Sequence, residues 1–203
     1  MDAPRALTDA RAAFVAAAGR LAAAGAAPEQ LAVTVPAYRM LGVIPRRESF
    51  RRSGQGFLLG ALLVTATGDV FEPGRIVRAS RQVLPGHQAE SAQARREVRQ
   101  GLLNSRFAEG TTVVIDARPL PLDDPDAMAA ELGPLVLRED AGEDAGEDAG
   151  EDAREAAGSV KVLVRWIPTA PDSALRPLNA YLAERLELAL TALGAARAES
   201  EHP

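Results

Sequence analysis

The chain has 203 residues, a formal net charge of −5 and 47% hydrophobic residues, which is typical of one globular domain with or without tails. It contains no cysteine, which excludes disulfides, thiolate nucleophiles, iron–sulfur clusters and cysteine zinc sites. Its histidines are His87 and His202 alone, so the sequence offers no multi-histidine metal site. We therefore expect neither a metal nor a cofactor.

The N-terminal residues 4–25 are predicted to form a helix. Leu7, Phe14 and Leu21 recur every seven residues, which places them on one helical face. The many alanines favour helix but supply little apolar area, so we expect this helix to be loosely docked.

Strands and turns are predicted for the next third of the chain. In chain order they are strands at 31–35 and 40–44, an arginine-rich turn at 46–52, an apolar strand at 57–65 and a return strand at 70–80. The strand at 57–65 is apolar throughout, so we expect it to be buried on both faces and central in a sheet. Thr67-Gly68-Asp69 is a hairpin turn, and Pro73-Gly74 interrupts the return strand.

The second half of the chain is predicted to hold two helices and three strands. In chain order they are a helix at 88–105, a strand at 111–117, a polar connection at 123–131, strands at 135–138 and 160–166, and a helix from 177 to 194. The strands at 135–138 and 160–166 are expected to pair as a hairpin. Because hairpins join most strands, we predict an α+β fold: a mostly antiparallel sheet with an N-terminal, a central and a C-terminal helix packed on it.

An acidic repeat lies inside the predicted hairpin. Its unit, Ala-Gly-Glu-Asp, begins at Ala141, Ala145 and Ala149. Few apolar groups and a high like charge are typical of disorder. We therefore expect 139–157 to be a disordered acidic loop inserted in an α+β domain of residues 29–203, with the helix of residues 1–28 set apart from it.

The charges of the chain are segregated along the sequence. Residues 39–106 carry twelve arginines against five acidic residues, whereas residues 123–157 carry thirteen acidic residues against two arginines. Arginine binds carboxylates and phosphates through a planar fork of donors. We expect folding to gather the following residues from separate segments on one face: Arg46, Arg47, Arg51, Arg52, Arg75, Arg78, Arg95, Arg99 and His87.

The expected partner of this arginine face is an anionic small molecule or an acidic protein segment, and the chain's own acidic loop is a candidate for covering it. Specific nucleic-acid binding is not expected, because few aromatic residues accompany the arginines. The alternative is that each arginine is solvated and paired with a neighbouring glutamate.

Catalytic motifs are missing from the sequence. It has no Gly-x-Ser-x-Gly and no P-loop, and a strand rather than a helix is predicted after Gly54, Gly56 and Gly60. We therefore expect a binding protein rather than an enzyme. Two alternatives remain: an amide hydrolase that uses His87 as a base, and a structural module that forms a homodimer through an apolar stripe consisting of Leu178, Leu182, Leu186, Ala189 and Leu193.

Transport signals and membrane segments are not predicted. The longest apolar run, 57–64, is far shorter than the roughly 20 residues that span a bilayer. Asp2 and Asp9 lie where a secretion signal would be positively charged. We expect a cytoplasmic protein that does not contact a membrane.

Several stretches of the chain carry a resemblance to known proteins. They are Phe57-Leu-Leu-Gly-Ala-Leu-Leu-Val, Ile76-Val-Arg-Ala, His87-Gln-Ala-Glu, Val164-Arg-Trp and Pro177-Leu-Asn-Ala-Tyr. Over about residues 55–195, without the acidic repeat, the chain resembles a group of small actinobacterial proteins, some of which carry the label glutaminase. A serine-dependent glutaminase requires Ser-x-x-Lys and an amidotransferase type requires cysteine. This chain has neither, so the resemblance does not imply that activity.

Overall fold

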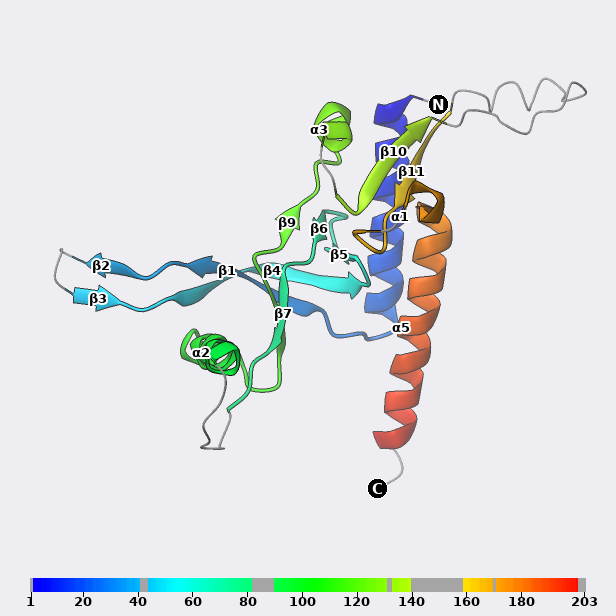
Figure 1. Cartoon of the computed structure of the whole chain (residues 1–203). Helices are drawn as coiled ribbons and strands as arrows, with labels where there is room; N and C mark the ends of the chain where they lie inside the picture. The colour runs from blue at the N-terminus through cyan, green and yellow to red at the C-terminus, as the bar shows by residue number, and fades with distance from the viewer. Residues whose placement is uncertain are drawn as a thin grey trace, which may run out of the picture. The chain divides into compact units, whose positions relative to one another are not determined.

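The structure is a computed structural model, shown in Figure 1, that describes residues 2–40, 44–81, 90–130, 133–139, 159–169 and 171–200. These ranges contain helices and a mostly antiparallel sheet, which confirms the predicted α+β class. The contacts of the chain divide it into two compact units. Unit 1 comprises Met1–Ala27, Phe57–Glu72 and Pro119–Pro203, and unit 2 comprises Pro28–Gly56 and Pro73–Arg118.

The described residues of unit 2 form one helix and six strands, apart from Arg118 at its end. They are β1 (Glu29–Val35), β2 (Tyr38–Met40), β3 (Ile44–Arg46), β4 (Ser49–Leu59), β7 (Arg75–Arg78), α2 (Glu90–Asn104) and β8 (Thr112–Ile115), with β4 continuing into unit 1. The sheet order is β7-β8-β1-β4. The β7–β8 and β1–β4 pairs are antiparallel, and the β8–β1 pair is parallel.

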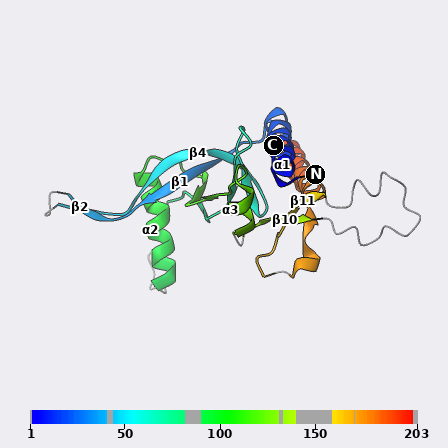
Figure 2. The ribbon, with the colours of Figure 1, turned by 90° about the horizontal axis from the view of Figure 1, so that it is seen from above.

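The β2–β3 hairpin continues the ribbon formed by β1 and β4 (Figure 2). Tyr38 is opposite Arg46 in this hairpin, so the single strand predicted at 40–44 is wrong, and residues 41–43 lie outside the described part of the chain. The turn predicted at 46–52 is also wrong from Ser49 onward. There β4 pairs with β1 and carries the buried Phe50 into the core, which polar neighbours concealed in the sequence.

Helix α2 is held against the sheet of unit 2 by an apolar cluster. Phe50, Leu102, Val113 and Ile115 are buried there. A Cβ atom at Gly101 would lie 2.8 Å from the Phe50 ring, so only glycine permits this close approach. The predicted central helix and the strand after it are thereby confirmed.

Unit 1 combines long helices with short strands. Its elements are α1 (Ala3–Ala23), β5 (Leu62–Val64), β6 (Val70–Glu72), α3 (Pro125–Ala130), β10 (Leu135–Glu139), β11 (Val160–Val164), the 3-10 helix η1 (Asp172–Ala174), β12 (Arg176–Pro177) and α5 (Leu178–Ser200). The last residues of β4 pair with β5, and β6 is joined to β9 (Arg118–Pro119) at the unit boundary. A second sheet has the order β10-β11-β12, which confirms the hairpin predicted for the first two of these strands.

The core of unit 1 lies along α1 and α5. Leu7, Phe14 and Leu21 of α1 are buried, as the seven-residue period predicts, and Tyr181 and Leu182 of α5 belong to the same cluster. Phe14 is fully buried, so the expected loose docking of α1 is wrong. By its contacts α1 belongs to unit 1, whereas the sequence analysis set residues 1–28 apart.

Three further predictions for unit 1 are wrong. The apolar run 57–65 is two strands, because Gly60 takes a positive φ of 66° and turns the chain between β4 and β5. The polar connection at 123–131 contains α3. Helix α5 continues past Gly194 to Ser200, because Gly194 does not take the positive φ of a glycine that ends a helix.

Residues 140–157 of the predicted acidic loop, which was expected at 139–157, lie outside the described residues. Among the helices that the structure does describe, none combines the length and the apolar composition that crossing a membrane requires.

Candidate anion-binding site

A hollow of about 230 Å³ lies between strand β7 and helix α2 in unit 2. The residues that line it are Arg75, Ile76, Val77, Arg78, Ala94, Arg95, Val98 and Arg99. Four of these are arginines that the sequence analysis had assigned to one face, and the other four are apolar. We call this hollow the β7–α2 site.

The periodicities of strand and helix explain why these side chains meet. On α2, Arg95 and Arg99 are four residues apart, as are Ala94 and Val98, so both pairs occupy the same side of the helix. On β7, Val77 packs with Val98 against the apolar cluster of unit 2. The β7–α2 site therefore combines an apolar floor at Val77 and Val98 with arginines of both elements in its lining.

The two arginines of β7 are weakly neutralised. Arg75 lies 3.9 Å from the carboxylate of Asp116, and both side chains are about half exposed, so this ion pair contributes little. Asp116 is instead held by Thr34, whose N–H and Oγ1 donate hydrogen bonds of 2.7 and 2.6 Å to it. Arg78 forms no ion pair with any residue in the described ranges. Both guanidinium groups can accept an external anion at low cost.

Helix α2 also carries Arg96, which follows Arg95 in the sequence. Nε and one Nη atom of Arg96 are shielded from solvent and have no hydrogen-bond partner. A buried donor without a partner costs about 1–3 kcal/mol. Arg96 does not line the β7–α2 site, so these unpartnered donors lie outside it.

Three of the remaining predicted residues, Arg47, Arg51 and Arg52, do not line the β7–α2 site. Arg52 donates a hydrogen bond to the carbonyl oxygen of Arg106, and its role is structural. Arg47 and Arg51 are exposed. Arg46 belongs to β3, but its side chain lies outside the described part of the structure, as does the whole of His87.

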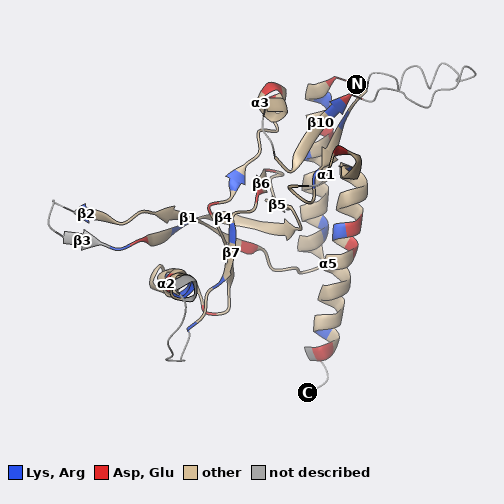
Figure 3. Cartoon of the chain, viewed as in Figure 1, with Lys and Arg blue, Asp and Glu red and all other residues tan. Residues whose placement is uncertain are grey.

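The charge segregation seen in the sequence follows the two compact units. The sequence of unit 2 contains thirteen arginines and six acidic residues, a net charge of +7. That of unit 1 contains ten basic and 22 acidic residues, a net charge of −12. Basic residues are visible on α2 and β7 in Figure 3. Unit 2 therefore carries the excess of positive charge in this chain.

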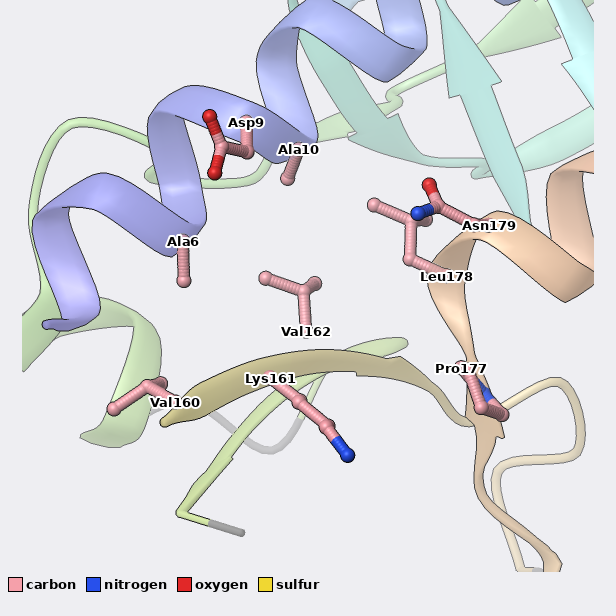
Figure 4. Close-up of a pocket in the computed structure, with 9 residues that line it drawn as sticks. All are labelled: Ala6, Asp9, Ala10, Val160, Lys161, Val162, Pro177, Leu178 and Asn179. Atoms are coloured by element: carbon pink, nitrogen blue, oxygen red, sulfur yellow. The ribbon is translucent and has the colours of Figure 1, made fainter. Parts of the chain in front are cut away.

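A second hollow, of about 310 Å³, lies in unit 1 between α1, β11 and the start of α5. Figure 4 shows Val162 pointing toward Ala6 and Ala10, whereas Lys161 extends to the other side of β11. Asp9 is the acidic residue of its lining. This hollow is mainly apolar and lacks a convergent set of charges, so it gives no indication of ligand chemistry.

The apolar floor of the β7–α2 site was missed by the sequence analysis. Part of the signal was available, because Arg75 and Val77 are two residues apart and therefore share one face of their strand. The pairing of that strand with β8, which positions it beside α2, had no sequence signal.

The described residues also contain no group of three or more metal-ligating side chains.

Comparisons with protein-family models, with curated proteins and with solved structures find no match for this chain.

Proposed function

We propose that unit 2 is a binding module for an anionic ligand and that the β7–α2 site is where the ligand binds. The observation that carries this proposal is the gathering of Arg75, Arg78, Arg95 and Arg99 around one hollow. Guanidinium groups form charge-assisted, often bidentate hydrogen bonds with carboxylates and phosphates. Arginines that were merely solvated would not need to surround a common cavity.

The size and lining of the site limit the kind of ligand. A volume of about 230 Å³ is smaller than the roughly 300–1,000 Å³ of pockets that enclose a drug-sized molecule. It accommodates a side chain or a small group, while the rest of the ligand lies along the surface. Val77 and Val98 favour an apolar group in the hollow, and the arginines favour carboxylates or phosphates around it.

The proposal is tested with a fluorescein-labelled hexaglutamate peptide, whose binding is followed by fluorescence anisotropy at low salt. The double variant Arg95→Gln/Arg99→Gln should weaken binding at least tenfold, because two charge-assisted contacts are lost. Inorganic pyrophosphate should compete with the peptide, and binding should weaken as salt is added.

The matched control is Arg47→Gln/Arg51→Gln, which removes the same charge from exposed positions of the same unit. It should change the affinity by less than about threefold. Circular dichroism spectra and melting temperatures of both variants establish that they are folded. Equal losses in the two double variants would show that only net charge matters, and the β7–α2 site would then be rejected.

A further inference from the structure

Strand β7 is an outer strand of its sheet. It stands at the end of the order β7-β8-β1-β4 and pairs with β8 alone among the described strands. An outer strand presents backbone N–H and C=O groups to which another extended chain can bind. The question is which groups of β7 point outward and what lies beside them.

The hydrogen-bond pattern identifies the outward groups. The N–H of Ala79 donates to the carbonyl oxygen of Thr111 across the antiparallel pair. Backbone N–H and C=O groups alternate in direction along a strand. The N–H and C=O groups of Arg75 and Val77 therefore also point toward β8, whereas those of Ile76 and Arg78 point away from it. The N–H of Asp116 donates to Ala32 on the other side of β8, which fits the same alternation.

The outward N–H groups of Ile76 and Arg78 donate no hydrogen bond, and their outward C=O groups accept none, among the residues that the structure describes. Ile76 itself is 50% exposed. Native proteins commonly protect an outer strand with charges, bulges or covering elements. Strand β7 is short and carries an arginine at each end, which limits unspecific pairing, and Ile76 is the apolar residue that it leaves half exposed. Arginines along such an edge favour pairing with an acidic chain.

The β7–α2 site lies along this same edge. All four residues of β7 line it, although neighbouring side chains of a strand point to opposite faces. The hollow must therefore reach the backbone edge of the strand. A chain added beside β7 would place alternate side chains next to Val77 and α2.

We infer that unit 2 binds an extended acidic peptide segment of a partner protein as an additional strand along β7. The inference rests on the proposed function and specifies the ligand of that site. Main-chain hydrogen bonds to Ile76 and Arg78 would hold the peptide backbone, and the arginines would hold its carboxylates. A small anion or a nucleic acid cannot reproduce this alternation of donors and acceptors.

The side chains of β7 predict the sequence that fits best. Residues directly opposite each other in neighbouring strands lie on the same face and contact each other. Opposite Arg75, Ile76, Val77 and Arg78, the favoured order is acidic, apolar, apolar, acidic. This order reads the same in both directions, so it suits a parallel or an antiparallel peptide.

Two labelled peptides of equal composition test the inference by fluorescence anisotropy with the full chain. The first is Asp-Glu-Val-Val-Glu-Asp, and the second, Val-Glu-Asp-Asp-Glu-Val, moves the valines to the ends. The first should bind at least fivefold more tightly. Equal affinities that are both lost in Arg95→Gln/Arg99→Gln would overturn strand addition while leaving the anion site intact. Affinities that are indifferent to that variant would reject the site itself.

A second arm tests the main-chain hydrogen bonds. The backbone nitrogens of both valines in the first peptide are methylated. Neighbouring N–H groups of a strand point in opposite directions, so one of the two lost N–H groups would have pointed to β7 whether the peptide binds parallel or antiparallel. Binding should weaken about tenfold or more. Ile76→Pro removes the outward N–H of the protein without touching the pairing with β8, and should have a similar effect. Unchanged binding of the methylated peptide would overturn the inference whether or not the proline variant folds.

Discussion

The guanidinium group of Arg52 lies over the aromatic ring of Phe107, with Cζ 5.0 Å from the ring centroid. The same group donates a hydrogen bond of 2.7 Å to the carbonyl oxygen of Arg106, a residue with a positive φ of 66°. Helix α2 ends at Asn104, so these contacts secure the backbone just after the helix. Arg52, which was predicted as part of the binding face, therefore stabilises the C-terminal end of α2, the helix that lines the β7–α2 site.

Arg52→Ala should lower the free energy of unfolding by about 1–2 kcal/mol, since it removes an exposed cation–π contact and a charged hydrogen bond. Urea denaturation followed by circular dichroism measures the loss. The affinity for hexaglutamate should stay within about twofold of the wild type. Arg51→Ala, which removes an exposed arginine from the neighbouring position, should leave stability unchanged. A large loss of affinity with full stability in Arg52→Ala would place Arg52 in the binding site instead.

The sequence predicted the elements that have a regular pattern. Leu7, Phe14 and Leu21 indicated the buried face of α1, and the expected hairpin of 135–138 and 160–166 is the β10–β11 pair. The gathering of arginines was expected from charge counts alone and stays a prediction. These features depend on local periodicity or on composition, which a single sequence contains in full.

The rest depended on long-range pairing that leaves no local signal. Nothing near Arg75 shows that its strand pairs with β8 at the edge of the sheet. Gly60 ends a strand inside a run of apolar residues. Both strands of the hairpin are buried and therefore apolar, so no change of hydropathy marks the turn in the sequence. Arg52 was predicted as a ligand residue because its charge was visible in the sequence, whereas its partner Phe107 lies 55 positions away.

Tyr181 should be essential for the β4–β5 turn in unit 1. Its hydroxyl donates to the carbonyl oxygen of Leu59 and accepts from the N–H of Ala61, both at 2.8 Å. Tyr181→Phe leaves these two backbone groups without a partner and should cost about 1–3 kcal/mol of unfolding free energy in urea titrations. Tyr38→Phe is the matched control, because Tyr38 is 53% exposed. Equal stability of the two variants would refute this role.

Asp172 should make the stability of unit 1 depend on acid pH. Arg165 and Arg138 donate hydrogen bonds of 2.9 and 2.6 Å to its carboxylate and hold its pKa below the ordinary value of 3.8. A lowered folded-state pKa stabilises the fold above pH 3.8, and this contribution is lost as the pH falls through the folded pKa. Asp172→Asn should therefore have a lower urea midpoint than the wild type at pH 7.

The difference between the two proteins should shrink as the pH is lowered from about 4 to 2. Asp126→Asn provides a control, because this exposed carboxylate belongs to the same unit. A difference between wild type and Asp172→Asn that stays constant across this pH range would exclude the ionised carboxylate as its cause.

The acidic residues of 140–158 should compete with an acidic ligand for unit 2. This segment carries eight acidic residues and one arginine, whereas unit 2 carries a net charge of +7. A tethered segment competes at an effective concentration of up to millimolar without any ligand being added. Replacing its aspartates and glutamates with asparagine and glutamine keeps the length and should tighten hexaglutamate binding severalfold at low salt. At 0.5 M NaCl, where screening shortens the range of charge interactions to about 4 Å, the gain should disappear. An affinity that does not change at low salt would show that the segment does not compete for the β7–α2 site.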